Sequence, residues 1–234
     1  MAAYYLGGYY VIKEIPVDFG SKKSQIISSC SDCLNDSLLY NWSYSWTTNN
    51  NEHIKKIKTD YQLNDETIQL IRQWVDNAFE EKKIGWINLF NDLETAKEYV
   101  AKFFSHVPNV KTIGIYFTET EIVDLLTEFK PPAENQSSIG LSQNLSKRLP
   151  EINSENEAFI GFDIIGIECT GGFHTFHCHD LSKYLEDIFK LQINQHGLFE
   201  DSQQWESVIK YMNDEVNGFE PVPWFVCKTK LVTE

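Results

Sequence analysis

The sequence predicts an α/β protein with a mixed sheet and helices packed on it; α+β is the alternative. Three observations point to this class. Residues 65–81 repeat apolar side chains at helical spacing, and residues 110–118 are rich in β-branched and aromatic side chains. Residues 158–169 are apolar at nearly every position, as expected for a strand that is buried on both faces.

The first half of the chain supplies most of the clear boundary signals. Asn91 or Asp92 can cap a helix, and Pro131-Pro132 must end one. Gly7-Gly8 interrupts an otherwise continuous Tyr-rich strand region. In this half we expect one or two strands over 4–19 and single strands over 38–46 and 110–118. We expect helices over 65–81, 92–105 and 119–129.

Residues 134–157 form a polar connector rich in Ser and Asn. It divides the chain into an N-terminal α/β half, 1–133, and a C-terminal α/β half, 158–234, which are separate or form one continuous domain. The C-terminal half has the order strand, helix, helix, strand, and no internal repeat is evident in the sequence. Its elements are expected over 158–169, 180–190, 202–216 and 220–232.

The net charge of −14 and the pI of about 4.8 exclude some classes of partner. An acidic surface repels phosphate backbones and anionic membranes, so we expect no direct nucleic-acid binding and no membrane association. No stretch has the length of a membrane span, and the N-terminus lacks a signal-peptide pattern. The odd number of cysteines, five, does not suggest a disulfide framework. We therefore expect a cytoplasmic protein.

The stretch "GGFHTFHCHDL", residues 171–181, places three histidines and a cysteine within six positions. If it is extended, His177 and His179 share one face and His174 lies on the other. His177 and His179 could then share a metal ion, with Asp180 or Glu168 as a further ligand. Packing of neutral imidazoles among aromatic rings is the alternative, and we expect no tightly bound ion and no cofactor. Gly171-Gly172 suggests a hairpin that pairs the stretch with 159–169.

Two smaller patterns also have a chemical and a structural interpretation. "CSDC", Cys30 and Cys33, is half of a zinc site, a redox pair or a loop with two free thiols. Asp163 and Glu168 interrupt an apolar strand. A buried Asp163 has to be hydrogen-bonded or protonated, which suits acid–base chemistry or helix capping. Phosphate-loop, dinucleotide-binding, serine-hydrolase and HExxH motifs are absent from the sequence.

The order of motifs over residues 158–226 resembles that of small cytosolic bacterial immunity-type proteins of toxin–immunity loci. An apolar strand leads into "GGFHTFHCHDL", followed by "NQHGLF", a Trp-bearing helix and "EPVPWF". The resemblance implies a non-enzymatic protein that binds and occludes a cognate toxin, often through an acidic face. The partner would be a basic, nuclease-like toxin.

The charge distribution indicates where such a partner would bind. Residues 134–234 have a net charge of −9 and residues 1–133 a net charge of −5. Acidic side chains on the last predicted helix would steer a basic protein, and tryptophans would anchor it. The candidate partner-binding residues are Asp201, Glu206, Asp214, Glu215, Trp205 and Trp224. The alternative function is a metal-dependent enzyme built around His174, His177 and His179. The oligomeric state stays open.

Overall fold

A computed structural model provides the structure of the chain. Several predicted features fall outside the part that it describes: most of the strand over 38–46, the helix over 180–190 up to residue 186, and Cys33, Cys169, Cys178, His179 and Asp180. The described residues are 2–19, 22–31, 34–39, 55, 58–85, 89–130, 141–152, 155–168, 172–177, 187–190, 193–201 and 205–233.

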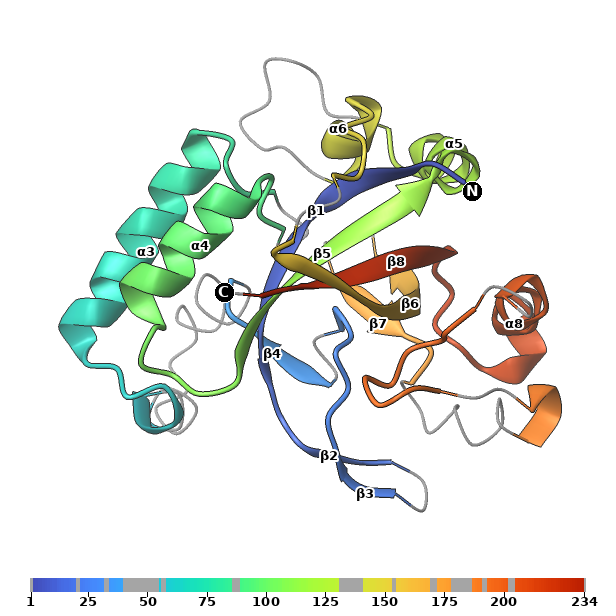
Figure 1. Cartoon of the computed structure of the whole chain (residues 1–234), viewed down its shortest axis with the longest axis horizontal. Coiled ribbons are helices and arrows are strands. Elements are labelled where there is room, and N and C mark those ends of the chain that lie inside the picture. Colours follow the sequence, from blue (N-terminus) through green and yellow to red (C-terminus); the bar gives the residue numbers. More distant parts are fainter. Residues whose placement is uncertain are drawn as a thin grey trace.

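A curled six-stranded sheet forms the centre of the molecule (Figure 1). Its spatial order is β4 (Asn35–Ser37), β1 (Tyr4–Glu14), β5 (Val110–Thr118), β8 (Trp224–Val232), β6 (Glu157–Ile167) and β7 (Phe173–Thr175). All of these pairings are antiparallel, where the sequence predicted a mixed sheet. A separate hairpin joins β2 (Val17–Phe19) to β3 (Lys22–Gln25). Each half of the chain contributes three strands to the one large sheet.

The helices begin where the sequence places their capping residues. The side chains of Asn64, Asp92 and Thr118 each accept a hydrogen bond from a backbone N–H of the first helical turn. The predicted helices over 65–81, 92–105 and 119–129 are confirmed, and α8 confirms the centre of the one over 202–216. The helices are α3 (Asp65–Glu80), α4 (Leu93–Phe103), α5 (Glu119–Glu128), α6 (Leu141–Ser146), α8 (Trp205–Met212) and the 3₁₀ turn η3 (Glu215–Asn217).

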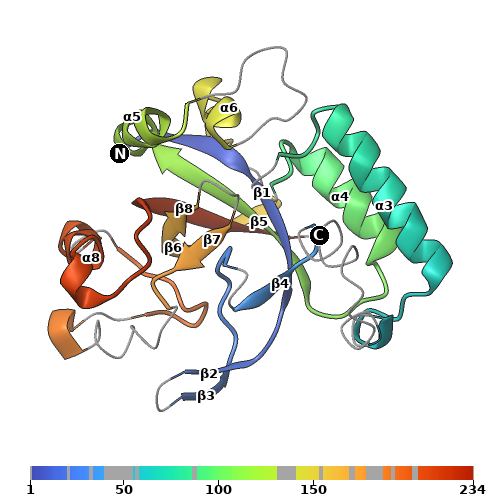
Figure 2. The same cartoon turned by 180° about the vertical axis from the view of Figure 1, so that it is seen from behind.

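The alternation of side chains along the strands distributes the core over both faces of the sheet. Tyr9 and Val11 of β1 pack with α3 and α4, whereas Tyr10 and Ile12 belong to a cluster with residues of α5 and α6. Ile164 of β6 packs with Val208 and Met212 of α8. The register places Tyr9, Val11 and Ile164 on the same face of the sheet, so α3 and α4 pack at one end of this face and α8 at the other. The α5 and α6 helices pack with the opposite face and lie together at one end of the sheet (Figures 1 and 2).

The two halves of the chain repeat one structural unit about a pseudo-two-fold axis. From edge to centre, one half of the sheet has the order β4, β1, β5, and the other half has the corresponding order β7, β6, β8. The strands β5 and β8 pair antiparallel at the centre. Ile115 of β5 pairs with Thr229 of β8. Gly8 of β1 pairs with the same Ile115, and Gly161 of β6 pairs with the same Thr229. The register is therefore the same on both sides of the axis.

Hydrogen bonds outside the ladders repeat as well. Tyr9 and Phe90 exchange two backbone hydrogen bonds of 2.8 Å, and Phe162 and Phe199 exchange two of 2.8 and 2.9 Å. In the first repeat the N–H of Leu38, which follows β4, donates to the carbonyl of Val11. In the second repeat the N–H of Phe176, which follows β7, donates to the carbonyl of Ile164. The sequence prediction of no internal repeat is therefore wrong. What the sequences share is short: "LFND", residues 89–92, and "LFED", residues 198–201.

Each repeat requires a glycine at the same point of its first strand. Both strands have a bulge there, and Gly8 and Gly161 have φ angles of +151° and +142°. A Cβ atom on Gly161 would lie 2.6 Å from Cβ of Leu198, and one on Gly8 would lie 3.0 Å from the carbonyl oxygen of Phe90. The missing side chain lets the Leu-Phe turn approach the strand backbone.

We expect Gly8→Ala and Gly161→Ala each to lower the free energy of unfolding by about 2–4 kcal/mol, because backbone strain adds to overlap. Chemical denaturation measures the change. Gly172→Ala is the matched control, since a Cβ there meets nothing closer than 3.5 Å. Destabilisation by Gly161→Ala with full tolerance of Gly8→Ala would show that the two repeats are not built alike.

Candidate functional site

The histidine-rich stretch begins as the strand that its hairpin signal predicts. Residues Phe173–Thr175 form β7 and pair with β6. His174 is mostly buried, and its Nε2 atom lies 2.7 Å from Oε1 of Glu168. Its Nδ1 atom lies 3.8 Å from a carboxylate oxygen of Glu220. Glu168 is therefore close to a histidine, but to His174 and not to His177.

His177 is buried in the second repeat, with 4% of its surface exposed. Its Nε2 atom lies 2.6 Å from the carbonyl oxygen of Gly197, so this nitrogen must carry the proton and donate it. Its ring centroid lies 3.9 Å from that of Phe176. These contacts fit the packing interpretation of His177 and leave its Nε2 atom unavailable to a metal.

Within the described residues, no group of three or more His, Cys, Asp and Glu side chains is arranged to hold a metal ion. His179 lies outside those residues, so the metal hypothesis is tested best in solution. We expect elemental analysis of the purified protein to find no stoichiometric zinc, iron or nickel after dialysis against a chelator. An ion that survives dialysis and is lost in His177→Ala/His179→Ala would contradict this expectation.

Asp163 is fully buried at the centre of a polar cluster. Ser29 Oγ donates to its Oδ2 atom at 2.6 Å, Thr175 Oγ1 lies 3.4 Å from its Oδ1 atom, and the backbone N–H groups of Cys30 and Ile164 add further bonds. The sequence left two alternatives for a buried Asp163, hydrogen bonds or protonation, and the structure shows the hydrogen bonds. Cys227 faces Asp163 across the β6–β8 pairing.

Burial dominates the electrostatics of this cluster. It raises the pKa of Asp163 to about 7, although the hydrogen bonds from Ser29 and Thr175 act in the opposite direction. Burial also raises the pKa of the Cys227 thiol. Cys30 and Cys227 are both buried, so the cluster lies in the core and not on a surface that a substrate could reach.

The raised pKa of Asp163 predicts a pH-dependent stability. In the unfolded chain its pKa is about 3.9, so between about pH 4 and pH 7 the native state binds more protons and its stability falls as pH rises. In Asp163→Asn, we expect the slope of unfolding free energy against pH over this range to be shallower by up to about 1.4 kcal/mol per pH unit. Urea titrations at several pH values measure it.

The exposed Glu128 supplies the control for this measurement, because Glu128→Gln also removes a carboxylate and should leave the slope unchanged. Glu121, whose pKa burial likewise raises to about 7, accounts for part of the remaining slope. An Asp163→Asn protein with the wild-type slope would mean that Asp163 is ionised throughout this pH range.

A second polar cluster spans the outer side of β5, β8 and β6. Lys230 lies 3.2 Å from Glu157 and 3.1 Å from Glu151, and Lys228 lies 2.6 Å from Glu151. The hydroxyl groups of Tyr9 and Tyr116 donate to the two carboxylate oxygens of Glu157. Two lysines thus face two glutamates, so these charges are matched within the protein and offer little to a ligand.

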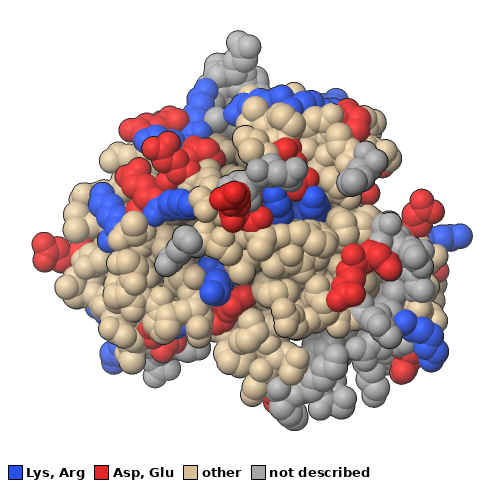
Figure 3. Space-filling view, viewed as in Figure 1, with Lys and Arg blue, Asp and Glu red and all other residues tan. Residues whose placement is uncertain are grey.

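The acidic residues predicted to bind a partner lie on and around α8. Asp201, Glu206 and Asp214 are exposed, and the side chain of Glu215 lies outside the described part. On the face of the molecule in Figure 3, charged groups form small clusters between broad uncharged areas. On this face, attraction for a basic partner would be local to such clusters.

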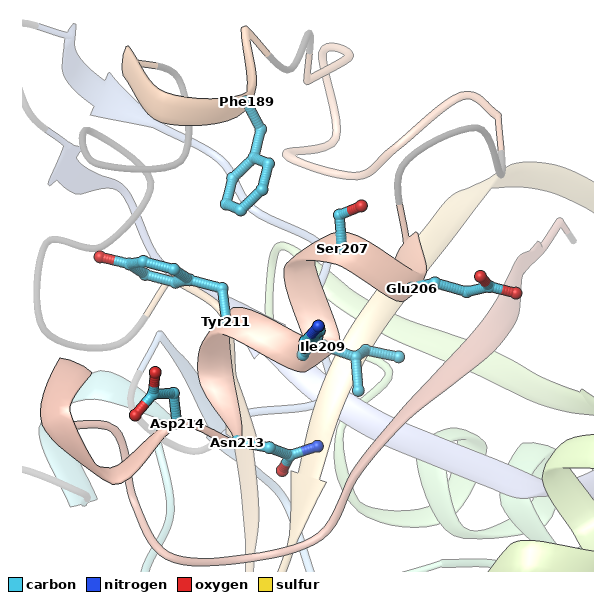
Figure 4. Close-up of a pocket in the computed structure, with 8 residues that line it drawn as sticks. Phe189, Glu206, Ser207, Ile209, Tyr211, Asn213 and Asp214 are labelled. Carbon is cyan, nitrogen blue, oxygen red and sulfur yellow. The ribbon is translucent and has the colours of Figure 1, made fainter.

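The outer surface of α8 borders an open hollow of about 880 Å³ (Figure 4). Phe189 points toward α8 from the preceding helical residues, and its ring centroid lies 5.6 Å from that of Tyr211. The residues that line the hollow are Phe189, Glu206, Ser207, Ile209, Lys210, Tyr211, Asn213 and Asp214. Sequence reasoning identified Glu206 and Asp214 but missed the aromatic pair, because the contact depends on how two separate segments pack.

The two tryptophans have different environments. Trp205 is partly exposed, and its ring centroid lies 4.5 Å from that of Phe162. Trp224 is 5% exposed and packs against Phe219 in the core cluster of the second repeat. In this conformation Trp224 has no surface with which to anchor a partner, so among the two only Trp205 remains a candidate.

No protein-family model, curated protein or solved structure matches this chain. None of the described helices is long and apolar enough to cross a membrane.

Proposed function

We propose that this chain is a non-enzymatic protein that binds a basic protein partner through the α8 surface, defined by Phe189, Glu206, Ile209, Tyr211 and Asp214. The more specific form of the proposal follows the sequence resemblance: an immunity-type inhibitor that occludes a cognate, nuclease-like toxin. The hollow over α8 is the observation that carries the proposal.

The composition of this surface supports binding of a protein. Phe189, Ile209 and Tyr211 give the hollow an aromatic and aliphatic centre, and Glu206 and Asp214 stand exposed at its margin. An apolar centre with a charged rim is the usual anatomy of a protein interface. Lys210 lies four residues from each of the two acids in the sequence, so a partner would have to place its own basic groups on either side of it.

The buried position of the other chemical groups also favours binding over catalysis. Asp163 and His177, the two best candidates for acid–base chemistry, are 0% and 4% exposed. A catalytic group has to come within hydrogen-bond reach of a substrate, and neither is accessible in this conformation.

The test is the rate at which this chain associates with the protein encoded by the gene next to its own. In Glu206→Lys/Asp214→Lys, we expect association to slow by about tenfold at low salt and dissociation to change less, because exposed charges act mainly on encounter. Physiological salt should shrink the difference, since screening acts over about 8 Å. Stopped-flow or surface-plasmon measurements give both rates.

Glu80→Lys/Glu128→Lys is the matched control: it makes the same change of net charge on exposed positions of α3 and α5. Its association rate should stay close to that of the wild type. Equal slowing in both double variants would assign the effect to overall charge. A wild-type rate that is unchanged in either variant and insensitive to salt would mean that the acidity serves solubility alone.

A further inference from the structure

The two repeats differ in what covers the outer edge of their first strand. In the first repeat this edge of β1 is occupied by residues of the same chain. The N–H of Leu6 donates to the carbonyl of Leu149, and the N–H of Glu151 donates to the carbonyl of Tyr4, both at 2.8 Å. Tyr5 and Pro150 form the antiparallel bridge between these bonds. Residues 149–151 thus act as a short added strand.

The helix before this segment completes the cover. The side chain of Asn144 in α6 donates to the carbonyl of Gly7 at 3.2 Å, and Leu141 lies against Gly7. Both α6 and residues 149–151 belong to the connection between the repeats.

In the register of the two repeats, Glu157 of β6 corresponds to Tyr4 of β1, and Phe159 corresponds to Leu6. Phe159 pairs with Lys230 just before the bulge, as Leu6 pairs with Tyr116. Among the described residues no backbone group bonds to the outward N–H of Phe159 or the outward C=O of Glu157. Such an edge is a template for another strand.

The side chains at this edge are also open. The Phe159 side chain is 48% exposed, although it is a large apolar group in a strand. A cavity of about 460 Å³ adjoins it, lined by Phe159, Ile160, Asn194, Gln195, His196 and Glu200. The side chain of Asn194 donates to the carbonyl of Ile160 at 2.7 Å, as Asn144 donates to Gly7, so the backbone beside the cavity is held in place.

We propose that the outer edge of β6 at Glu157–Phe159 accepts an extended segment of a partner protein, which carries Lys or Arg next to an apolar residue and pairs antiparallel with β6. Backbone hydrogen bonds would supply affinity, and contact with Phe159 would supply specificity for the apolar residue. Residues 149–151 on β1 provide the template for the geometry.

Charge decides in favour of a basic partner over a second copy of this chain. Glu155 and Glu200 are exposed beside the edge, so an isologous pairing of two β6 edges would bring like charges together. Lys and Arg of a partner would meet these acids instead. This basic character is the point at which the inference relies on the proposed function, but the β6 edge is separate from the α8 surface.

The probe is the hexapeptide Lys-Arg-Leu-Pro-Lys-Ile, acetylated and amidated. It is the sequence of residues 147–152 with lysine at the position of Glu151. We expect saturable binding to the full chain, with amide chemical-shift changes that centre on residues 157–160. N-methylation of the second lysine, whose N–H would bond to Glu157, should weaken binding at least tenfold. N-methylation of the isoleucine, whose N–H points away, should not.

Variants of the chain test the same edge from the other side. Phe159→Pro removes the outward N–H and Phe159→Ala removes only the ring, so affinity should fall in both and further in the first. Glu200→Lys should weaken binding several-fold, and Glu80→Lys on α3 is its matched control. If Phe159→Pro does not fold, the N-methylated peptides still decide the question.

Three results would overturn the proposal: no saturable binding at millimolar peptide, binding that N-methylation does not affect, or shift changes centred elsewhere. A dimer of the free chain that Phe159→Pro dissociates would identify a second copy as the occupant and overturn the basic partner. Glu206→Lys/Asp214→Lys should bind the peptide as the wild type does. The β6 edge and the α8 surface can thus fail or hold independently.

Discussion

The approach of a Leu-Phe turn to a bulged strand is the constraint on which each half of this fold depends. At Gly8 and again at Gly161 the strand backbone passes so close to the turn that a Cβ atom would overlap it. In each case the next described helix along the chain, α4 or α8, covers the same strand with its apolar face. One glycine therefore fixes the position of a turn, a helix and a layer of core.

The repeat also explains why the chemical groups gather in one half. Across the pseudo-two-fold axis Asp163 corresponds to Tyr10, and Cys227 to Ile113. The first repeat fills these positions with apolar and aromatic groups, whereas the second needs Ser29 and the backbone of Cys30 to satisfy a buried carboxylate. A segment from the first half thus completes the core of the second, which ties the two repeats together.

The surfaces differ for a related reason. The connection between the repeats lies against the edge of β1, and α3 places Trp74 against Phe90 and Tyr99. In the second half, the edge of β6 and the outer surface of α8 keep exposed apolar groups near carboxylates. Among the described residues, the first strand of the second repeat has the less covered edge. This repeat also lies in the more acidic half of the chain, and both proposed binding surfaces belong to it.

The sequence by itself determined the elements. Apolar spacing placed α3, and apolar spacing together with the capping side chain of Asp92 placed α4, because these signals act within one or two helical turns. The apolar run over 158–169 predicted a buried strand, and Gly171-Gly172 predicted its pairing with β7. The polar character of Asp163 within that run predicted a side chain that is hydrogen-bonded or protonated, since burial of a bare charge is too costly.

Only the tertiary structure decided how these elements are arranged. The antiparallel order of the sheet and the pseudo-two-fold axis depend on pairings between residues far apart in the chain, such as Ile115 with Thr229. Two short similar stretches cannot reveal a repeat in which other corresponding positions differ in size and polarity, as Tyr10 and Asp163 do. The hollow between Phe189 and Tyr211 and the open edge at Phe159 are likewise properties of packing. They depend on which surfaces the rest of the chain leaves uncovered, and no local sequence pattern indicates which surfaces these are.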